Sequence, residues 1–198
     1  MKRFINILIF IFIFVLYFVT FLMIYDNFRE RKLNSQEDKA IEIFDKKIDK
    51  KKEDSNSNQS QSHSVSYRGY TILGRLQIPN AYVNTVIIKE QTYAAMNIGA
   101  VKTHGVDLNE KGGFVISGHN FRGKSVFFYN IKNLKPGNII KITDNKGRTI
   151  DYKVYEVNRF QSPTDVSYFN KTDDYHVVLV TCENGGKSRI IVKAHITE

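Results

Sequence analysis

The length and charge of the chain limit what it can be. Its 198 residues allow one sizeable domain with additional segments, and its 14 Phe and 11 Tyr provide material for a core. Lys and Arg number 29 against 20 Asp and Glu, a net charge of +9. The basic residues are scattered and form no stripe with interleaved aromatic residues, which argues against a nucleic-acid partner. The excess of basic over acidic residues is compatible with a role in solubility or with an anionic surrounding, such as a membrane surface or a cell-wall polymer. A single Cys excludes an intramolecular disulfide.

An apolar segment lies near the start of the chain. Phe4 to Ile24 is interrupted only by Asn6 and Thr20, and as a helix it would span about 32 Å, enough to cross a bilayer core. A cleaved signal peptide would have a shorter apolar region that ends in small residues, whereas this run ends in large ones. We therefore predict an uncleaved transmembrane anchor over residues 1–25. Basic residues flank both ends, so the positive-inside rule does not fix its orientation.

Residues 26–66 are expected to separate this anchor from a folded domain. Their first part is charged in mixed sign, and Ile41, Phe44 and Ile48 keep a helical spacing, which predicts a solvated, partly helical stalk. Ser55–Ser64 reads SNSNQSQSHS and has too few apolar residues to fold. We therefore predict a flexible linker there.

Residues 67–198 have the pattern of an all-β domain. Short apolar or alternating runs predict strands in Tyr70–Ile78, Tyr82–Ile88, Phe114–Ser117, Asn138–Val157 (as a hairpin) and Val177–Ala194 (as two strands). Short helical segments are predicted in Gln91–Gly99 and Val126–Asn133. We predict about seven to eight strands in a closed or nearly closed β-barrel, because closure hides strand edges better than an open sheet does.

The segment VVLVTCENGGKSRIIVKA places a cysteine and an arginine at one end of the predicted sheet. Cys182 ends the first strand, and Arg189 lies near the start of the second, after a turn that contains two glycines. A thiol near a fixed cation loses its proton more easily, and the thiolate is the nucleophilic form. Taken alone, a single cysteine among apolar residues is more often a small buried hydrophobe.

A thiolate nucleophile is commonly paired with a histidine that is distant in sequence. His119 follows the apolar run FVIS and Gly118, so it emerges at a strand end, where it is both anchored and accessible. A histidine satisfied by backbone groups at a turn is the alternative. The other histidines have ordinary explanations, in the linker, a polar loop, a strand and the chain end: His63, His104, His176 and His195.

Three motifs in this order, behind an N-terminal anchor, resemble the sortases, which are membrane-anchored cysteine transpeptidases of bacterial surfaces. They are ISGHN at Ile116–Asn120, LVTC at Leu179–Cys182 and RIIVKA at Arg189–Ala194, and LGRLQIP and MNIGAV upstream add support. The resemblance covers about Tyr70 to Ile196. It implies a sortase-like closed β-barrel at the surface of a Gram-positive cell, with the barrel outside the membrane.

The resemblance also implies roles for single residues. Cys182 would be the nucleophile, His119 the general acid and base, and Arg189 the group that holds substrate and stabilises the oxyanion. Thr181 and the backbone N–H of Glu183 would lie on the oxyanion and substrate side. The implied reaction cleaves an LPXTG-like sorting signal after Thr and transfers the protein to a cell-wall amine. The implied partners are surface proteins with a C-terminal sorting signal and a peptidoglycan precursor or other amine acceptor.

Several alternatives stay open at this level. The motifs fit a class A, D or E sortase. No cofactor is predicted, although some class A members bind calcium; the carboxylates that would supply oxygens are Asp107, Glu110, Asp165, Asp173 and Asp174. The competing functions are another surface thiol hydrolase, an L,D-transpeptidase, or a non-catalytic membrane-tethered binding module.

Overall fold

The computed structural model describes residues 2–53, 64–121, 128–160, 169 and 174–197. The expected linker and most of the predicted loop that follows Phe160 lie outside these ranges. The chain divides into two compact units, Met1–Gln36 and Glu37–Glu198. Helix α1 (Lys2–Glu53) contributes to both.

In the first unit, Arg3–Phe28 of α1 is long and apolar enough to cross a membrane, and none of it is buried. It is the only such helix in the described ranges. Large side chains such as Phe10 and Phe14 are more than two-thirds exposed, as a lipid-facing helix requires. The segment is therefore compatible with the membrane anchor predicted from the sequence.

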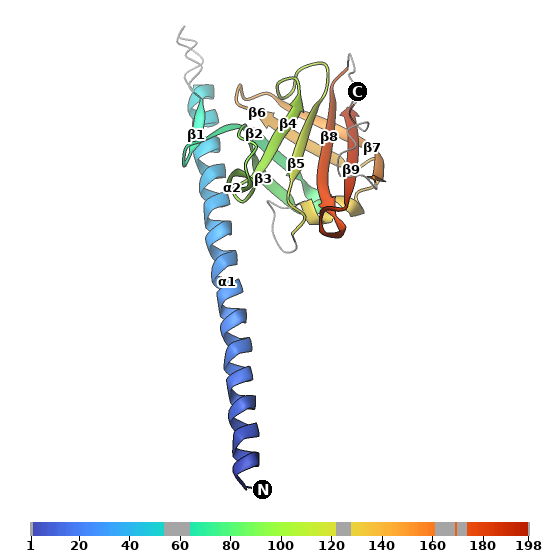
Figure 1. Cartoon of the computed structure of the whole chain (residues 1–198). Helices are drawn as coiled ribbons and strands as arrows, with labels where there is room; N and C mark the ends of the chain where they lie inside the picture. Colours follow the sequence, from blue (N-terminus) through green and yellow to red (C-terminus); the bar gives the residue numbers. More distant parts are fainter. Residues whose placement is uncertain (1, 54–63, 122–127, 161–168, 170–173, 198) are drawn as a thin grey trace. The chain divides into compact units, whose positions relative to one another are not determined.

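The second unit is built on a closed β-barrel (Figure 1). Its strands are β1 (Val65–Tyr67), β2 (Tyr70–Ile78), β3 (Val83–Ile88), β4 (Ala100–Gly105), β5 (Phe114–Gly118), β6 (Ile139–Asp144), β7 (Thr149–Phe160), β8 (His176–Glu183) and β9 (Ser188–Ile196). Its short helical segments are η2 (Pro79–Ala81), α2 (Tyr93–Met96), η3 (Phe128–Asn133) and η4 (Asn184–Gly186).

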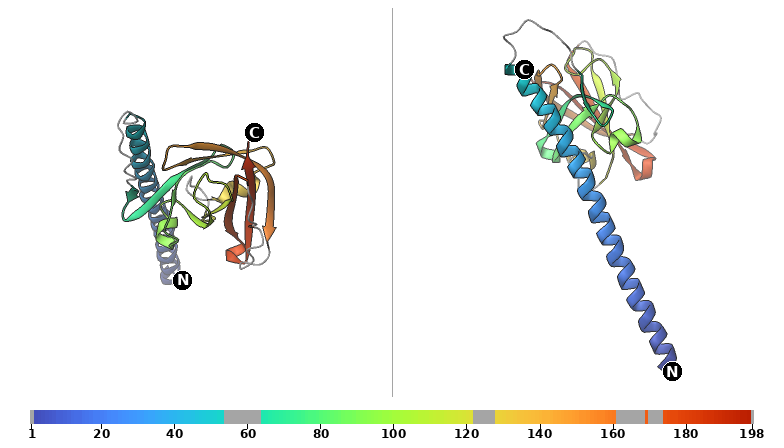
Figure 2. Two further views of the ribbon diagram at one scale, coloured as in Figure 1. Left: turned by 90° about the horizontal axis from the view of Figure 1, so that it is seen from above. Right: turned by 90° about the vertical axis from the view of Figure 1, so that its left-hand side faces the viewer.

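The strand order explains how the sheet closes. Neighbouring strands follow the order β1-β2-β3-β4-β5-β8-β9-β7-β6, and a further pairing of β2 with β6 joins the two sides, so β2 to β9 form a ring of eight strands (Figure 2). The pairs β3–β4 and β5–β8 are parallel, and the others are antiparallel. The all-β barrel predicted from the sequence is confirmed. Strand β4 was not among the predicted segments, because its outer half is polar and carries no apolar alternation.

The barrel interior is filled by apolar side chains that alternate along the strands. In the predicted hairpin β6/β7, Tyr152 and Val154 are buried, and Phe114 of β5 meets the Tyr152 ring edge to face at 6.0 Å. The Tyr152 hydroxyl donates a hydrogen bond to Oδ1 of buried Asn109 at 3.0 Å. A buried tyrosine needs such a partner, and here the barrel supplies it internally.

The end of α1 belongs to the barrel unit. Ala40, Phe44 and Ile48, at a spacing of four residues, are buried against apolar side chains of β1, β2 and β3. The charged side of this segment also binds the barrel, since Nη1 of Arg75 lies 2.7 Å from Oδ2 of Asp45. The sequence suggested a solvated stalk here. The structure covers its apolar face instead, because three residues at helical spacing form one continuous stripe.

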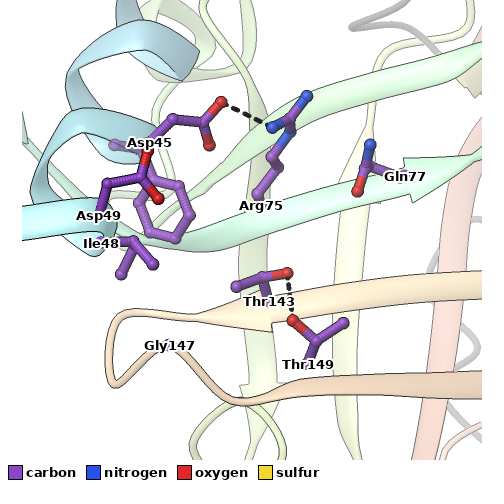
Figure 3. Close-up of a pocket in the computed structure, with 9 residues that line it drawn as sticks. Asp45, Ile48, Asp49, Arg75, Gln77, Thr143, Gly147 and Thr149 are labelled. Carbon is purple, nitrogen blue, oxygen red and sulfur yellow. Dashed lines mark hydrogen bonds and ion pairs between the residues drawn. The ribbon is translucent and has the colours of Figure 1, made fainter. Parts of the chain in front are cut away.

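A polar cleft of about 310 Å³ lies between this helical segment and strands β2, β6 and β7 (Figure 3). Asp45 and Asp49 line it from the helix, and Arg75 and Gln77 line it from β2. None of the predicted catalytic residues lines this cleft.

Candidate active site

The parallel pairing of β5 with β8 brings the predicted histidine and cysteine to one end of the barrel. Gly118 at the end of β5 pairs with Thr181 of β8. His119 directly follows Gly118, and Cys182 directly follows Thr181. Parallel strands end at the same edge of a sheet, and in Figure 1 both strands run toward the same end of the barrel. The two residues, 63 positions apart in sequence, therefore emerge side by side.

The antiparallel pairing of β8 with β9 adds the arginine. Cys182 and Arg189 are direct partners in the register. Residues directly opposite each other in an antiparallel pair project to the same face, with Cβ atoms about 4.5–5.5 Å apart. The turn between them contains Asn184, Gly185 and Gly186, all with positive φ (51°, 66° and 91°). Glycine adopts such angles without strain, so the two glycines permit the tight reversal that sets this register.

The guanidinium of Arg189 is held by the turn. Its Nη1 donates to the backbone carbonyls of Gly186 at 2.9 Å and Ser188 at 3.0 Å. The neighbouring carboxylate of Glu183 is instead paired with Nε of Arg159 at 3.1 Å. Within the described part of the chain, Arg189 forms no ion pair. An un-neutralised, half-buried cation beside Cys182 is suited to stabilising negative charge on sulfur or on an oxyanion.

His119 packs against two aromatic rings. Its ring centroid is 4.7 Å from that of Tyr93 and 5.2 Å from that of Phe121. Burial lowers the pKa of His119, and a hydrogen bond with the Tyr93 backbone opposes this in part. The neutral imidazole is therefore favoured near pH 7. A neutral ring can accept a proton, and the resulting imidazolium readily gives it up, as a general acid and base requires.

Tyr93 is positioned by a local capping motif. Thr92 is the N-cap of the short helix α2, and its hydroxyl accepts a hydrogen bond from the backbone N–H of Ala95 at 3.1 Å. This cap fixes the turn that carries Tyr93. The sequence did not identify Tyr93, because it precedes His119 by 26 residues and belongs to an unremarkable helical segment.

Two side-chain hydrogen bonds fasten the ends of β5 and β8 together. Nδ2 of Asn120 donates to the Cys182 carbonyl, and the Thr181 hydroxyl donates to the Gly118 carbonyl at 2.7 Å. Thr181 is buried, whereas the Cys182 side chain is exposed as a free thiol. Asn120 was part of a sequence motif, but it was not assigned a role. Its place directly after His119 was the one available signal.

The other histidines and candidate calcium-binding carboxylates that the structure describes lie elsewhere. His104 is exposed on β4, and His176 and His195 pair at the opposite end of β8 and β9 from Cys182. The carboxylate of Glu110 is bound by Lys146 and Arg148 at 2.9 and 2.7 Å. Among the described residues, no group of three or more His, Cys, Asp and Glu side chains is placed to hold a metal ion. Two of the carboxylates considered for calcium, Asp165 and Asp173, lie outside the described ranges.

The structure therefore presents a thiol, an imidazole and a guanidinium at the ends of neighbouring strands of a closed β-barrel. The family model of the sortase domain matches residues 76–197. The chain belongs to the sortase family, whose members are cysteine transpeptidases.

Individual relatives agree with this assignment. Sortase A of Listeria monocytogenes is 28% identical over 120 residues, which cover 61% of this chain and 53% of the relative, so the match spans about half of that protein. Sortase A of Bacillus anthracis is 24% identical over 164 residues, which cover 80% of this chain and 77% of the relative.

Solved structures show the same fold. The Sortase D5 transpeptidase of Clostridium perfringens superposes with a TM-score of 0.63 and 28% identity, over 83% of this chain and 99% of that structure. Sortase A of Listeria monocytogenes superposes with a TM-score of 0.58 and 25% identity, over 64% of this chain and 88% of that structure.

Proposed function

We propose that this sortase cleaves an LPXTG-like sorting signal after its threonine and transfers the protein to a cell-wall amine through a thioester on Cys182. The observation that supports the proposal most directly is the strand register. It places Arg189 opposite Cys182 and brings His119 to the end of the adjacent strand. Fold similarity alone would not assign chemistry to these three side chains.

In the first half of the reaction, the thiol proton of Cys182 passes to His119, and the thiolate attacks the carbonyl carbon of the threonine. A carbon–sulfur bond forms, and negative charge develops on the carbonyl oxygen. Arg189 and the backbone N–H of Glu183 stabilise this oxyanion. The peptide C–N bond then breaks as His119 protonates the departing amine, which leaves a thioester on Cys182.

In the second half, the acceptor amine attacks the thioester carbonyl. His119 takes the proton from the attacking nitrogen, the carbon–sulfur bond breaks, and a new amide bond forms. Arg189 stabilises the oxyanion a second time. Thr181 supports the site, because its hydroxyl donates a hydrogen bond to the Gly118 carbonyl and so holds the ends of β5 and β8 together.

The cellular setting follows from the same proposal. The N-terminal helix holds the enzyme in the membrane by a single span, with the barrel on the extracellular side, where surface proteins and peptidoglycan precursors are present. The similarity to Sortase D5 over almost all of that structure supports a place among the class A, D and E types, and class D in particular. The exact sorting motif is set by side chains of the substrate groove.

The test uses the full-length chain in detergent, incubated with an LPXTG-type peptide and triglycine as the amine. We expect cleavage and formation of the triglycine adduct, and we expect Cys182→Ala and His119→Ala each to abolish both. His104→Ala, which changes an exposed histidine on β4, is the matched control and should retain activity. Cleavage that survives Cys182→Ala would contradict the mechanism. Cleavage without adduct would indicate a thiol hydrolase, and a Cys182 inert to thiol reagents at neutral pH would indicate a binding module.

A further inference from the structure

A second histidine site lies at the other end of the two strands that carry Cys182 and Arg189. His176 and His195 are direct partners in the β8/β9 register. His176 lies six residues along β8 from Cys182, which corresponds to about 20 Å at about 3.3 Å per residue. Because partners in an antiparallel pair project to the same face, both imidazoles lie on one side of the sheet.

An irregularity in the neighbouring strand directs a tyrosine onto this pair. The β7/β9 register shifts between Val154 and Glu156, so Tyr155 has no direct partner across the strands. Such bulges re-aim side chains. The Tyr155 ring lies 5.7 Å from that of His176 and 5.4 Å from that of His195, and its hydroxyl is 3.1 Å from Nε2 of His176. The three rings therefore form one cluster, with both imidazoles packed against a single phenol.

The hydrogen bonds of His195 leave one nitrogen suited to metal binding. Its Nδ1 lies 3.0 Å from the carbonyl oxygen of Ile196. A carbonyl can only accept, so Nδ1 carries the hydrogen, and the lone pair of the neutral ring is on Nε2. Histidines that bind metals almost always donate their other N–H to a carbonyl or carboxylate in this way, because it fixes the tautomer and the ring orientation.

The surroundings of His176 favour its neutral imidazole. Burial lowers the pKa of His176, and Lys193 and His195 lower it further, while Asp174 and Glu156 oppose them. Lys193 is paired with the Glu156 carboxylate at 3.3 Å, which offsets its charge. At neutral pH, protons therefore compete little for the His176 ring.

We propose that His176 and His195 together bind a divalent first-row transition-metal ion with a preference for imidazole ligands, such as Zn²⁺ or Cu²⁺. The described residues offer no third His, Cys, Asp or Glu ligand at this position, so water completes the coordination and the affinity is modest. At His176 the metal replaces the hydrogen bond of Nε2 with Tyr155. The bound ion bridges the first residue of β8 and the penultimate residue of β9, far from the proposed active site.

The test uses untagged full-length chain carrying Cys182→Ala, in detergent, so that the active-site thiol cannot bind the metal. Calorimetric titration with ZnCl₂ should show one ion per chain, and Cu²⁺ should give an electron paramagnetic resonance spectrum with nitrogen couplings. We expect His176→Gln and His195→Gln each to weaken binding at least about tenfold. The exposed histidine variant His104→Gln should bind as the parent does.

A second readout separates loss of the site from loss of the fold. A ligand that binds only the folded state raises the melting temperature with increasing concentration. Zn²⁺ should therefore raise the Tm of the parent and of His104→Gln, but not that of His195→Gln, which changes an exposed side chain. Absence of binding to the parent would overturn the proposal, and so would binding by the His176→Gln or His195→Gln variant that is as tight as binding by the parent.

Discussion

Replacement of Arg189 tests the chemistry assigned to the strand register. Arg189→Ala removes the cation opposite Cys182, together with two hydrogen bonds to the turn carbonyls. Loss of one oxyanion donor in a preorganised site typically lowers kcat by about 10²–10³-fold, or about 2.7–4 kcal/mol, and we expect a loss in this range. Arg189→Lys keeps the charge but lacks the planar fork, which here contacts two carbonyls through one nitrogen. We expect most of the loss to remain in that variant.

The cost to stability should be much smaller than the cost to catalysis. Hydrogen bonds of this kind contribute about 0.5–1.5 kcal/mol each, less than the stability of a typical domain, so the variant should remain folded. The assay is the rate of triglycine adduct formation by the full-length chain at saturating peptide, with circular dichroism as the check on folding.

The matched control for charge is Arg159→Ala. Arg159 lies on the adjacent strand β7 and is paired with the side chain of Glu183, and its side chain is mostly exposed. Arg159 is not opposite Cys182 in the strand register, so the rate should change by less than about fivefold. The oxyanion role is refuted if Arg189→Ala retains activity within tenfold of the parent. If Arg159→Ala loses as much activity as Arg189→Ala, local positive charge in general, and not the oxyanion role of Arg189, accounts for the loss.

Three further predictions concern stability and pH. Because burial lowers the pKa of His119, the folded state binds fewer protons than the unfolded state, and stability should fall as the pH drops below about 6.5. In melting experiments at decreasing pH, His119→Gln should reduce this loss of stability. Gly118→Ala would place a Cβ 2.8 Å from the ring of Phe128, and we expect about 1–3 kcal/mol of destabilisation in urea unfolding together with reduced cleavage; an unchanged midpoint would show that the ring moves aside freely. Phe44→Ala should destabilise the barrel unit by about 3–5 kcal/mol, and the exposed Ile43→Ala by about 0.5 kcal/mol or less; equal effects would contradict the packing of this helical segment on the barrel.

Most of the fold could be predicted from local pattern. The hairpin β6/β7 was evident because Tyr152 and Val154 alternate with polar residues and a turn sequence joins the strands. The buried strand β5 was evident as a short apolar run before Gly118. Strand β4 was missed, since it is stabilised by pairing with β3 and β5 and carries little periodicity of its own.

The environment of the candidate site was less accessible from the sequence. Cys182, His119 and Arg189 were identified because each stands at the end of a recognisable strand. Tyr93 packs on His119 from a separate helix, and the Asn120 side chain reaches the carbonyl of Cys182. Contacts of this kind join segments far apart in the chain and leave no periodic signal in either.

The sequence by itself determined the apolar N-terminal segment, the β character of the C-terminal domain and the three candidate catalytic side chains, because each depends on residue type and short-range spacing. The tertiary structure decided that Cys182 faces Arg189, that His176 faces His195, and that Phe44 packs on the barrel. Strand pairing has a period of two, so a slip of one residue would exchange the two faces of β8 and separate both pairs. Register and long-range packing are properties of the closed barrel as a whole, and no single segment encodes them.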